Sequence, residues 1–168
     1  MKFLLLGALI ASQMSFADDT YDAVLAHLSG IEETPTQAEL QAIGDGVETA
    51  LIAIAQDDQQ PRSKRGRAIV ALGYFPSSDS RVVVEGALQG EDNYMARKAC
   101  YAIGAGWGTD AVPLLTNALQ ADNVHTREAA AVVLGTVGGD NARSVLTSRL
   151  DTETSEVVRE AIQSALAQ

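Results

Sequence analysis

The sequence predicts an all-α protein built as a short α-solenoid, a stack of antiparallel helix pairs. A fixed period of 31 residues separates two sets of positions, Leu88, Leu119 and Leu150 and Gly73, Gly104 and Gly135. Apolar residues in each unit follow the three-and-four spacing of a helix packed on one side. A Gly-rich turn separates two helix-length patterns in each unit, and the two-residue alternation of strands is missing from the sequence. Repeated helical hairpins are therefore expected.

Residues 1–17 are typical of a secretory signal peptide. Lys2 is a minimal positive region, Phe3–Ile10 is an apolar run, and Ser15-Phe16-Ala17 is a small-x-small cleavage site. A membrane anchor is the alternative, but the apolar run is shorter than the roughly 20 residues that a bilayer span needs. We therefore expect cleavage after Ala17 and a protein that is periplasmic or secreted, with no membrane insertion.

Negative charge is concentrated in the N-terminal part of the chain. The formal net charge is −10, and residues 18–61 contain ten acidic side chains and no lysine or arginine. Nucleic acids and anionic membranes both require positive charge on their partners, so neither is expected to bind here. A basic protein partner or solubility alone explains the acidic segment better.

The chain divides into a cap and repeats. Residues 18–61 are expected to form an N-terminal helical cap or degenerate repeat, with helices over Tyr21–Leu28, Thr36–Ile43 and Val47–Ala55. Repeats are expected at about 62–91, 92–122 and 123–154, and a C-terminal half repeat at 155–168.

Each full repeat is predicted to hold two helices. In the second repeat these span Met95–Ile103 and Asp110–Gln120. The periodic glycines directly follow the last apolar residue of each first helix, so we expect them to end these helices in the left-handed conformation that glycine adopts without steric cost. The periodic leucines are expected to be buried positions that lock the units together.

The segment Arg127–Gly135 (REAAAVVLG) resembles the first helix of HEAT repeats, particularly the PBS-lyase HEAT-like type. Gly108–Leu119 is similar to that family's second helix, and the resemblance covers about residues 62–168. It implies a HEAT-like right-handed superhelix, with the second helices on its concave face. It also implies a scaffold or partner-binding module, because the family consists mainly of such proteins.

An arginine column belongs to the same resemblance. Arg65, Arg127 and Arg159 hold the family position eight residues before the glycine, whereas the second repeat has Ala96 there and Arg97 one place later. Arginine in this column is expected to bridge repeats through an acidic residue of the adjoining loop. The basic cluster Arg62, Lys64, Arg65 and Arg67 has two interpretations, an anion or acidic-protein site and a structural set paired with the acidic residues just upstream.

No catalytic constellation emerges from the sequence, so we expect no enzyme activity, cofactor or metal. His27 and His125 lack a metal-ligand pattern. Gly104–Gly108 contains Gly-x-Gly-x-Gly, but it follows a helix and lacks the rest of a phosphate loop. Cys100 is the single cysteine and is expected to be a buried helix residue; a reactive thiol is the alternative.

The predicted partner-binding residues come from the exposed row of the second helices and from one turn: Arg81, Glu85, Thr116, Asn117, Arg143, Thr147, Ser148 and Trp107. An aromatic residue such as Trp107 in an exposed turn serves either as a binding anchor or as a cover for the core.

The function expected from these observations is that of a small exported HEAT-repeat scaffold or adaptor, a monomer that binds another protein without catalysis. Two alternatives remain. One is a chromophore- or small-molecule-handling lyase-like protein, because the resembled family includes subunits of bilin lyases. The other is an accessory or regulatory subunit of an exported enzyme. The partner's identity does not follow from the sequence.

Overall fold

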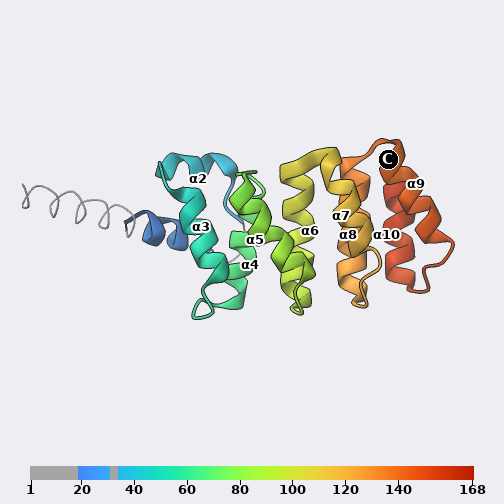
Figure 1. The fold of residues 1–168 in the computed structure, drawn as a ribbon, viewed down its shortest axis with the longest axis horizontal. Coiled ribbons are helices and arrows are strands. Elements are labelled where there is room, and N and C mark those ends of the chain that lie inside the picture. The colour runs from blue at the N-terminus through green and yellow to red at the C-terminus, as the bar shows by residue number, and fades with distance from the viewer. Residues whose placement is uncertain (1–18, 31–33) are drawn as a thin grey trace, which may run out of the picture.

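The structure, a computed structural model, describes residues 19–30 and 34–168. Its helices follow one another along a single long axis (Figure 1). After a helix over 19–27 come α2 (Gln37–Ile43), α3 (Val47–Gln56), α4 (Arg62–Leu72), α5 (Ser78–Gln89), α6 (Asn93–Trp107), a 3₁₀ turn (Gly108–Ala111), α7 (Val112–Ala118), α8 (Val124–Val137), α9 (Gly139–Leu150) and α10 (Glu156–Leu166). These described ranges contain no strand, and the all-α solenoid is confirmed. The predicted signal peptide and its cleavage site after Ala17 lie outside the described residues.

The repeats form two layers. The first helices of the repeats, α4, α6, α8 and α10, pack tightly side by side, whereas the second helices, α5, α7 and α9, contact one another only sparsely. The first-helix layer is therefore the more tightly packed of the two. The expectation that the second helices line a concave face stays a prediction.

The periodic glycines explain how the first helices come so close. Each of these column glycines faces the next first helix: Gly73 faces Ala102 of α6, Gly104 faces Val133 of α8, and Gly135 faces Ala165 of α10. A Cβ atom at Gly73 would lie 2.7 Å from the backbone oxygen of Ala102, and one at Gly135 would lie 2.6 Å from the Cβ of Ala165. Real Cβ atoms cannot approach that closely, so the close contact requires glycine.

The prediction that these glycines end the first helices in a left-handed conformation was wrong. Gly73 follows α4 with right-handed angles (φ −62°, ψ −20°), and the other two column glycines lie inside α6 and α8. The left-handed residues are instead Gly108 (φ 50°) and Gly138 (φ 69°), which directly follow α6 and α8. The observed α6, Asn93–Trp107, is thus longer than the predicted Met95–Ile103 because it runs through its glycine. Glycine inside a helix costs only about 1 kcal/mol relative to alanine, which close packing offsets.

Side-chain caps set where α6 and α8 begin. The Asp92 carboxylate accepts hydrogen bonds from the N–H groups of Tyr94 (2.9 Å) and Met95 (3.2 Å) at the start of α6. Asn123 caps α8 in the same way through the N–H groups of His125 (3.0 Å) and Thr126 (3.1 Å). These bonds satisfy free donors of the first turn, so α6 and α8 each start at a fixed residue.

Alanine and large aliphatic residues fill the core between the layers. Leu119 is fully buried, as predicted, whereas the other periodic leucines, Leu88 and Leu150, are partly buried against the core. Cys100 is buried in α6, and burial raises the pKa of its thiol to about 12. The interpretation of Cys100 as a buried helix residue is confirmed.

Replacing Leu119 by alanine should lower the free energy of unfolding by about 2–5 kcal/mol, because the site is closed on all sides and leaves a cavity. Chemical denaturation followed by circular dichroism measures the change. Val82→Ala is the matched control, since Val82 is 72% exposed and its loss should cost less than about 0.5 kcal/mol. Equal effects of the two substitutions would contradict the assignment of Leu119 to the core.

Candidate protein-binding surface

Arginines of the repeat column hold the ends of the preceding second helices. Each donates to a backbone carbonyl there: Arg65 to Ala55 (3.2 Å), Arg127 to Ala121 (2.8 Å) and Arg159 to Leu150 (2.8 Å). Carbonyls at a helix C-terminus lack partners within the helix, so these bonds stabilise the junction between repeats.

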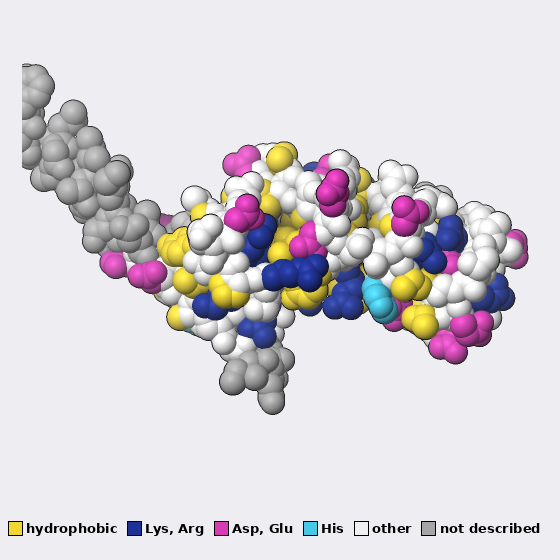
Figure 2. All heavy atoms as spheres, turned by 90° about the horizontal axis from the view of Figure 1, so that it is seen from below, with side chains coloured by type: hydrophobic (Ala, Val, Ile, Leu, Met, Phe, Trp, Pro, Cys, Tyr) yellow, Lys and Arg dark blue, Asp and Glu magenta, His cyan; other side chains and the backbone are white. Residues whose placement is uncertain are grey.

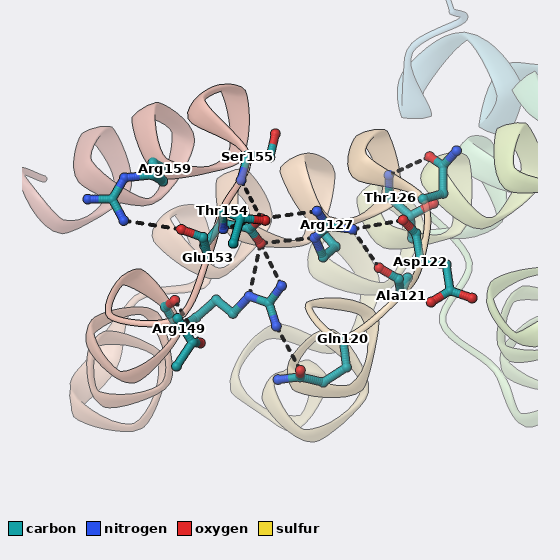
Figure 3. Close-up of polar contacts among 12 residues, drawn as sticks. Gln120, Ala121, Asp122, Thr126, Arg127, Arg149, Glu153, Thr154, Ser155 and Arg159 are labelled. Atoms are coloured by element: carbon teal, nitrogen blue, oxygen red, sulfur yellow. Dashed lines mark hydrogen bonds and ion pairs between the residues drawn. The ribbon is translucent and has the colours of Figure 1, made fainter.

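Glu153, in the loop between α9 and α10, ties α8 and α9 of the third repeat to the start of the C-terminal half repeat (Figure 3). Its carboxylate accepts a two-point contact from Arg127 (2.9 and 3.0 Å) and further hydrogen bonds from Arg149 (3.0 and 2.6 Å). The N–H groups of Thr154 (3.0 Å) and Ser155 (2.9 Å) complete its coordination. The Glu153 side chain is 0% exposed, so its charge is fully shielded from water and fully paired.

These partners decide the charge state of Glu153. Burial alone would raise the pKa of its carboxyl group, but the hydrogen bonds from Arg127, Ser155 and Arg149 outweigh burial and lower the pKa to about 2. The carboxylate therefore stays ionised throughout the physiological range and the bridge stays intact.

Three members of the basic cluster at the start of α4 have contacts within the chain, but only Arg65 pairs with an acidic residue just upstream, as the structural interpretation expects. Arg62 pairs with Asp92, Arg65 pairs with Asp58 (2.8 Å), and Arg67 donates to the carbonyl of Leu28 (2.8 Å). The expected bridge from column arginines to acidic loop residues is confirmed at Arg65 and Arg127.

The second repeat departs from this arrangement. Ala96 holds the column position and is buried, so α6 has no arginine at the junction, while Arg97 lies on the other side of the helix surface. Arg97 shares one face of α6 with Tyr94, Lys98 and Tyr101, because their spacing of three, four and seven residues is that of a single helix face. We call these four residues the α6 patch.

Three cationic side chains gather around the ring of Tyr94. Its ring centroid lies 4.8 Å from the guanidinium of Arg62, 5.5 Å from the Nζ of Lys98 and 5.9 Å from the guanidinium of Arg97. The ring packs on α4 at Gly66, where a Cβ atom would lie only 2.5 Å from it. The aromatic face thus holds cations close together.

Two of these cations are not neutralised within the described part of the chain. Arg62 pairs with Asp92, but no described carboxylate forms an ion pair with Arg97 or Lys98. Burial lowers the pKa of Lys98, and the charges of Arg97 and Arg67 lower it further. Like charges therefore repel one another in this patch.

Apolar side chains and a hollow border the patch. Tyr101 of α6 and Val132 of α8 occupy equivalent repeat positions and are 40% and 41% exposed. Beside them, a hollow of about 190 Å³ lies between the starts of α6 and α8 and is lined by Asn93, Tyr94, Arg97, Asn123 and His125. Figure 2, which views the edge where the first helices begin, shows Lys and Arg side chains gathering over the middle of the stack beside a histidine.

The residues predicted to bind a partner mostly contact their own chain. Arg81 pairs with Glu85 (2.6 Å) on α5, and Arg143 of α9 donates to the carbonyl of Leu166 (2.8 Å). Three hydroxyls bond to carbonyls one turn earlier in their own helices, those of Thr116 (2.7 Å), Thr147 (2.9 Å) and Ser148 (3.0 Å).

The structure brings two of the predicted residues together. Thr116 and Asn117 line a groove of about 460 Å³ between α7 and α9, with Pro113 and Val145 among its apolar members. Trp107 ends α6 and packs, half-buried, against the core, so it covers the helical core. The row is therefore divided among three second helices, with Arg81 and Glu85 on α5, Thr116 and Asn117 on α7, and Arg143, Thr147 and Ser148 on α9.

The α6 patch was missed because sequence analysis searched the second helices. Its signal was present in the spacing of Tyr94, Arg97, Lys98 and Tyr101, which lies opposite the apolar positions of the same helix. The sequence shows that the arginine stands at position 97 and not at 96. Only the structure shows that this arginine does not bind at the junction between repeats.

Other classes of site receive no support within residues 19–30 and 34–168. No grouping of His, Cys, Asp and Glu there has the geometry to hold a metal ion. None of the helices described has both the length and the apolar character to span a membrane.

The fold and its surfaces define a helical-repeat scaffold. A family model of HEAT repeats matches residues 81–167, and the chain belongs to this family. Human deoxyhypusine hydroxylase in complex with glycerol is a similar solved structure, with a TM-score of 0.59 and 23% identity over 82% of this chain and 44% of that chain. The likeness shows the fold alone, and this chain spans less than half of that protein's length. A search of curated proteins finds no match.

Replacing Glu153 by glutamine should lower the free energy of unfolding by about 3–5 kcal/mol at neutral pH, since it leaves two shielded arginines without their anion. The folded pKa lies below the unfolded value, so the bridge contributes stability above about pH 4.5 and loses it as the pH falls toward 2. This contribution amounts to about 3 kcal/mol.

Urea titrations from pH 6 to pH 3 should therefore show the wild-type stability falling faster than that of Glu153→Gln. Glu160→Gln, which removes an exposed carboxylate of α10, is the control and should run parallel to the wild type. Parallel curves for wild type and Glu153→Gln would show that the carboxylate is not held in this bridge.

Proposed function

We propose that the protein is an exported, non-catalytic scaffold or adaptor that binds another protein on its first-helix layer. One observation carries the proposal: the first-helix layer presents the exposed side chains of Tyr101 and Val132 together with the partly exposed cations Arg97 and Lys98, which no described carboxylate neutralises. Tyrosine and arginine are the side chains that dominate binding energy at protein interfaces.

The rigidity of this layer supports the proposal. Tyr101 and Val132 stand on α6 and α8, which the column glycine Gly104 brings into direct contact. Side chains on packed helices lose little freedom on binding, so a flat row of such residues gives affinity at low entropic cost.

A non-catalytic role agrees with the state of the potential reactive groups. The thiol of Cys100 is buried and its pKa is raised to about 12, so it is not poised as a nucleophile. His125 lies 3.2 Å from Glu128 on the exposed surface of α8, where a solvated pair is the simpler interpretation. Export rests on the sequence of residues 1–17, and a monomeric state remains an expectation.

The row predicted on the second helices stays a prediction. Its best-supported part is the groove between α7 and α9, which Thr116 and Asn117 line. A partner that bridges both layers would use this groove as a second contact, and the experiment below separates the two faces.

Site-specific crosslinking in the native cell envelope tests the proposal. A benzophenone amino acid in place of Tyr101 or Val132 should yield one discrete crosslinked species whose second component is a protein identified by mass spectrometry. The same group in place of Thr147 reports on the second-helix row, and in place of Val82, on α5, it serves as an exposed control.

Crosslinks at Thr147 without any at Tyr101 and Val132 would move the binding surface to the second helices. No crosslink at any position would contradict the scaffold role. Visible absorbance that co-purifies with the protein would instead favour the chromophore-handling alternative.

A further inference from the structure

We infer that the α6 patch binds an acidic segment of the partner protein, a short peptide stretch in which aspartate or glutamate side chains alternate with apolar ones. This inference rests on the proposed function, because it assigns a chemistry to the partner of the first-helix layer. Arg97 and Lys98 would pair with the carboxylates, and Tyr101 and Val132 would receive the apolar side chains.

The charge of the patch is available to a ligand. Arg62 already pairs with Asp92, and Glu128 of α8 bonds to His125, so neither carboxylate serves Arg97 or Lys98. Both cations lie within 6 Å of the same tyrosine ring, at 5.9 and 5.5 Å. A carboxylate placed between them would remove their mutual repulsion and add charge-assisted hydrogen bonds.

Partial burial strengthens such pairing. Lys98 is desolvated enough that burial, and then the charges of Arg97 and Arg67, lower its pKa. An ammonium group in this state gains more from an incoming carboxylate than a fully hydrated one, because less water has to be displaced on binding.

The second repeat differs from the others in the position of its arginine, which is Arg97 and not residue 96 of the column. In the other repeats, the column arginines donate to helix-end carbonyls, and Arg127 also holds the buried carboxylate of Glu153. Arg97 has no such structural task within the described part of the chain, because Ala96 occupies the junction. Its charge is therefore free for intermolecular use.

The dimensions of the patch suit a short peptide. Tyr94 and Tyr101 are two helical turns apart, which corresponds to about 10 Å along α6. Three or so residues of an extended chain cover that length. The adjacent exposed side chain of Val132 continues the apolar part of the surface onto α8.

Charge distribution favours an acidic protein segment over a long polyanion. The chain has a net charge of −10, and nucleic acids or anionic membranes bind through many cations spread over a wide surface. Here the two unpaired cations of the α6 patch, Arg97 and Lys98, lie on one helix and border apolar side chains. A short ligand that carries both carboxylates and apolar groups matches this surface best.

Fluorescence anisotropy with a labelled peptide of alternating glutamate and leucine tests the inference on the mature protein. The peptide should bind at low salt and weaken at least about tenfold when ionic strength rises from about 50 mM to about 500 mM, because salt screens the pairs. A matched peptide with glutamine in place of glutamate should bind at least about tenfold more weakly at low salt.

The double variant Arg97→Glu and Lys98→Glu should lower the affinity for the acidic peptide by at least about tenfold. The control is Arg81→Glu with Arg143→Glu, which changes the net charge equally on the other layer and should alter the affinity less than about threefold. The neutral pair Arg97→Gln and Lys98→Gln should keep the thermal midpoint at or above that of the wild type, since it removes repulsion, while still losing the peptide. Equal losses in the two double variants would overturn the inference.

Binding of a polyanion to the α6 patch would give a different result in this experiment. If a heparin oligosaccharide or single-stranded DNA binds the α6 patch more tightly than the acidic peptide, the partner is a polyanion and the inference fails. Crosslinking at Tyr101 with no effect of the charge variants on peptide affinity would support the scaffold role and overturn the inference that the partner segment is acidic.

Discussion

The close approach of the first helices is the constraint on which the rest of the structure depends. Gly73, Gly104 and Gly135 place no side chain of their own between neighbouring helices, and the alanines beside them keep the interface thin. The second helices lack such contacts and are more widely spaced. The first-helix layer is therefore the more tightly packed of the two layers. The glycines that repeat every 31 residues thus mark contacts between first helices. The positive-φ glycines that follow α6 and α8 are Gly108 and Gly138.

The same architecture explains why the junctions and the binding surface use the same kind of residue. Arg127 is needed where one repeat meets the next, because the carbonyls at the end of α7 and the shielded carboxylate of Glu153 both require a donor. Where Ala96 takes this position, the adjacent arginine faces outward beside Tyr94 and Lys98. α6 is thus the one first helix described that lacks the column arginine, and its neighbouring arginine carries a surface charge in place of a structural one.

Sequence analysis predicted the helical solenoid because helix spacing and a constant period are local properties of the chain. It also predicted the burial of Leu119 and the bridging role of Arg127, since both belong to columns that repeat. It assigned the wrong role to the column glycines because a glycine after an apolar run has the same signature whether it ends a helix or faces another helix. The α6 patch lay beyond its reach for a related reason: whether Arg97 has a partner depends on residues of α4 and α8 that only the fold brings near.

Gly135→Ala, compared with Gly86→Ala, tests the helix-contact account most directly. Both glycines lie inside helices, but a Cβ atom at Gly86 would meet nothing within 4 Å, whereas one at Gly135 would meet the Cα of Ala165 at 2.9 Å. Chemical denaturation should show that Gly86→Ala stabilises the protein by roughly 0.5–1 kcal/mol through helix propensity. Gly135→Ala should instead destabilise it by about 1–3 kcal/mol through overpacking. Stabilisation by both substitutions would contradict the claim that the periodic glycines hold the first helices together.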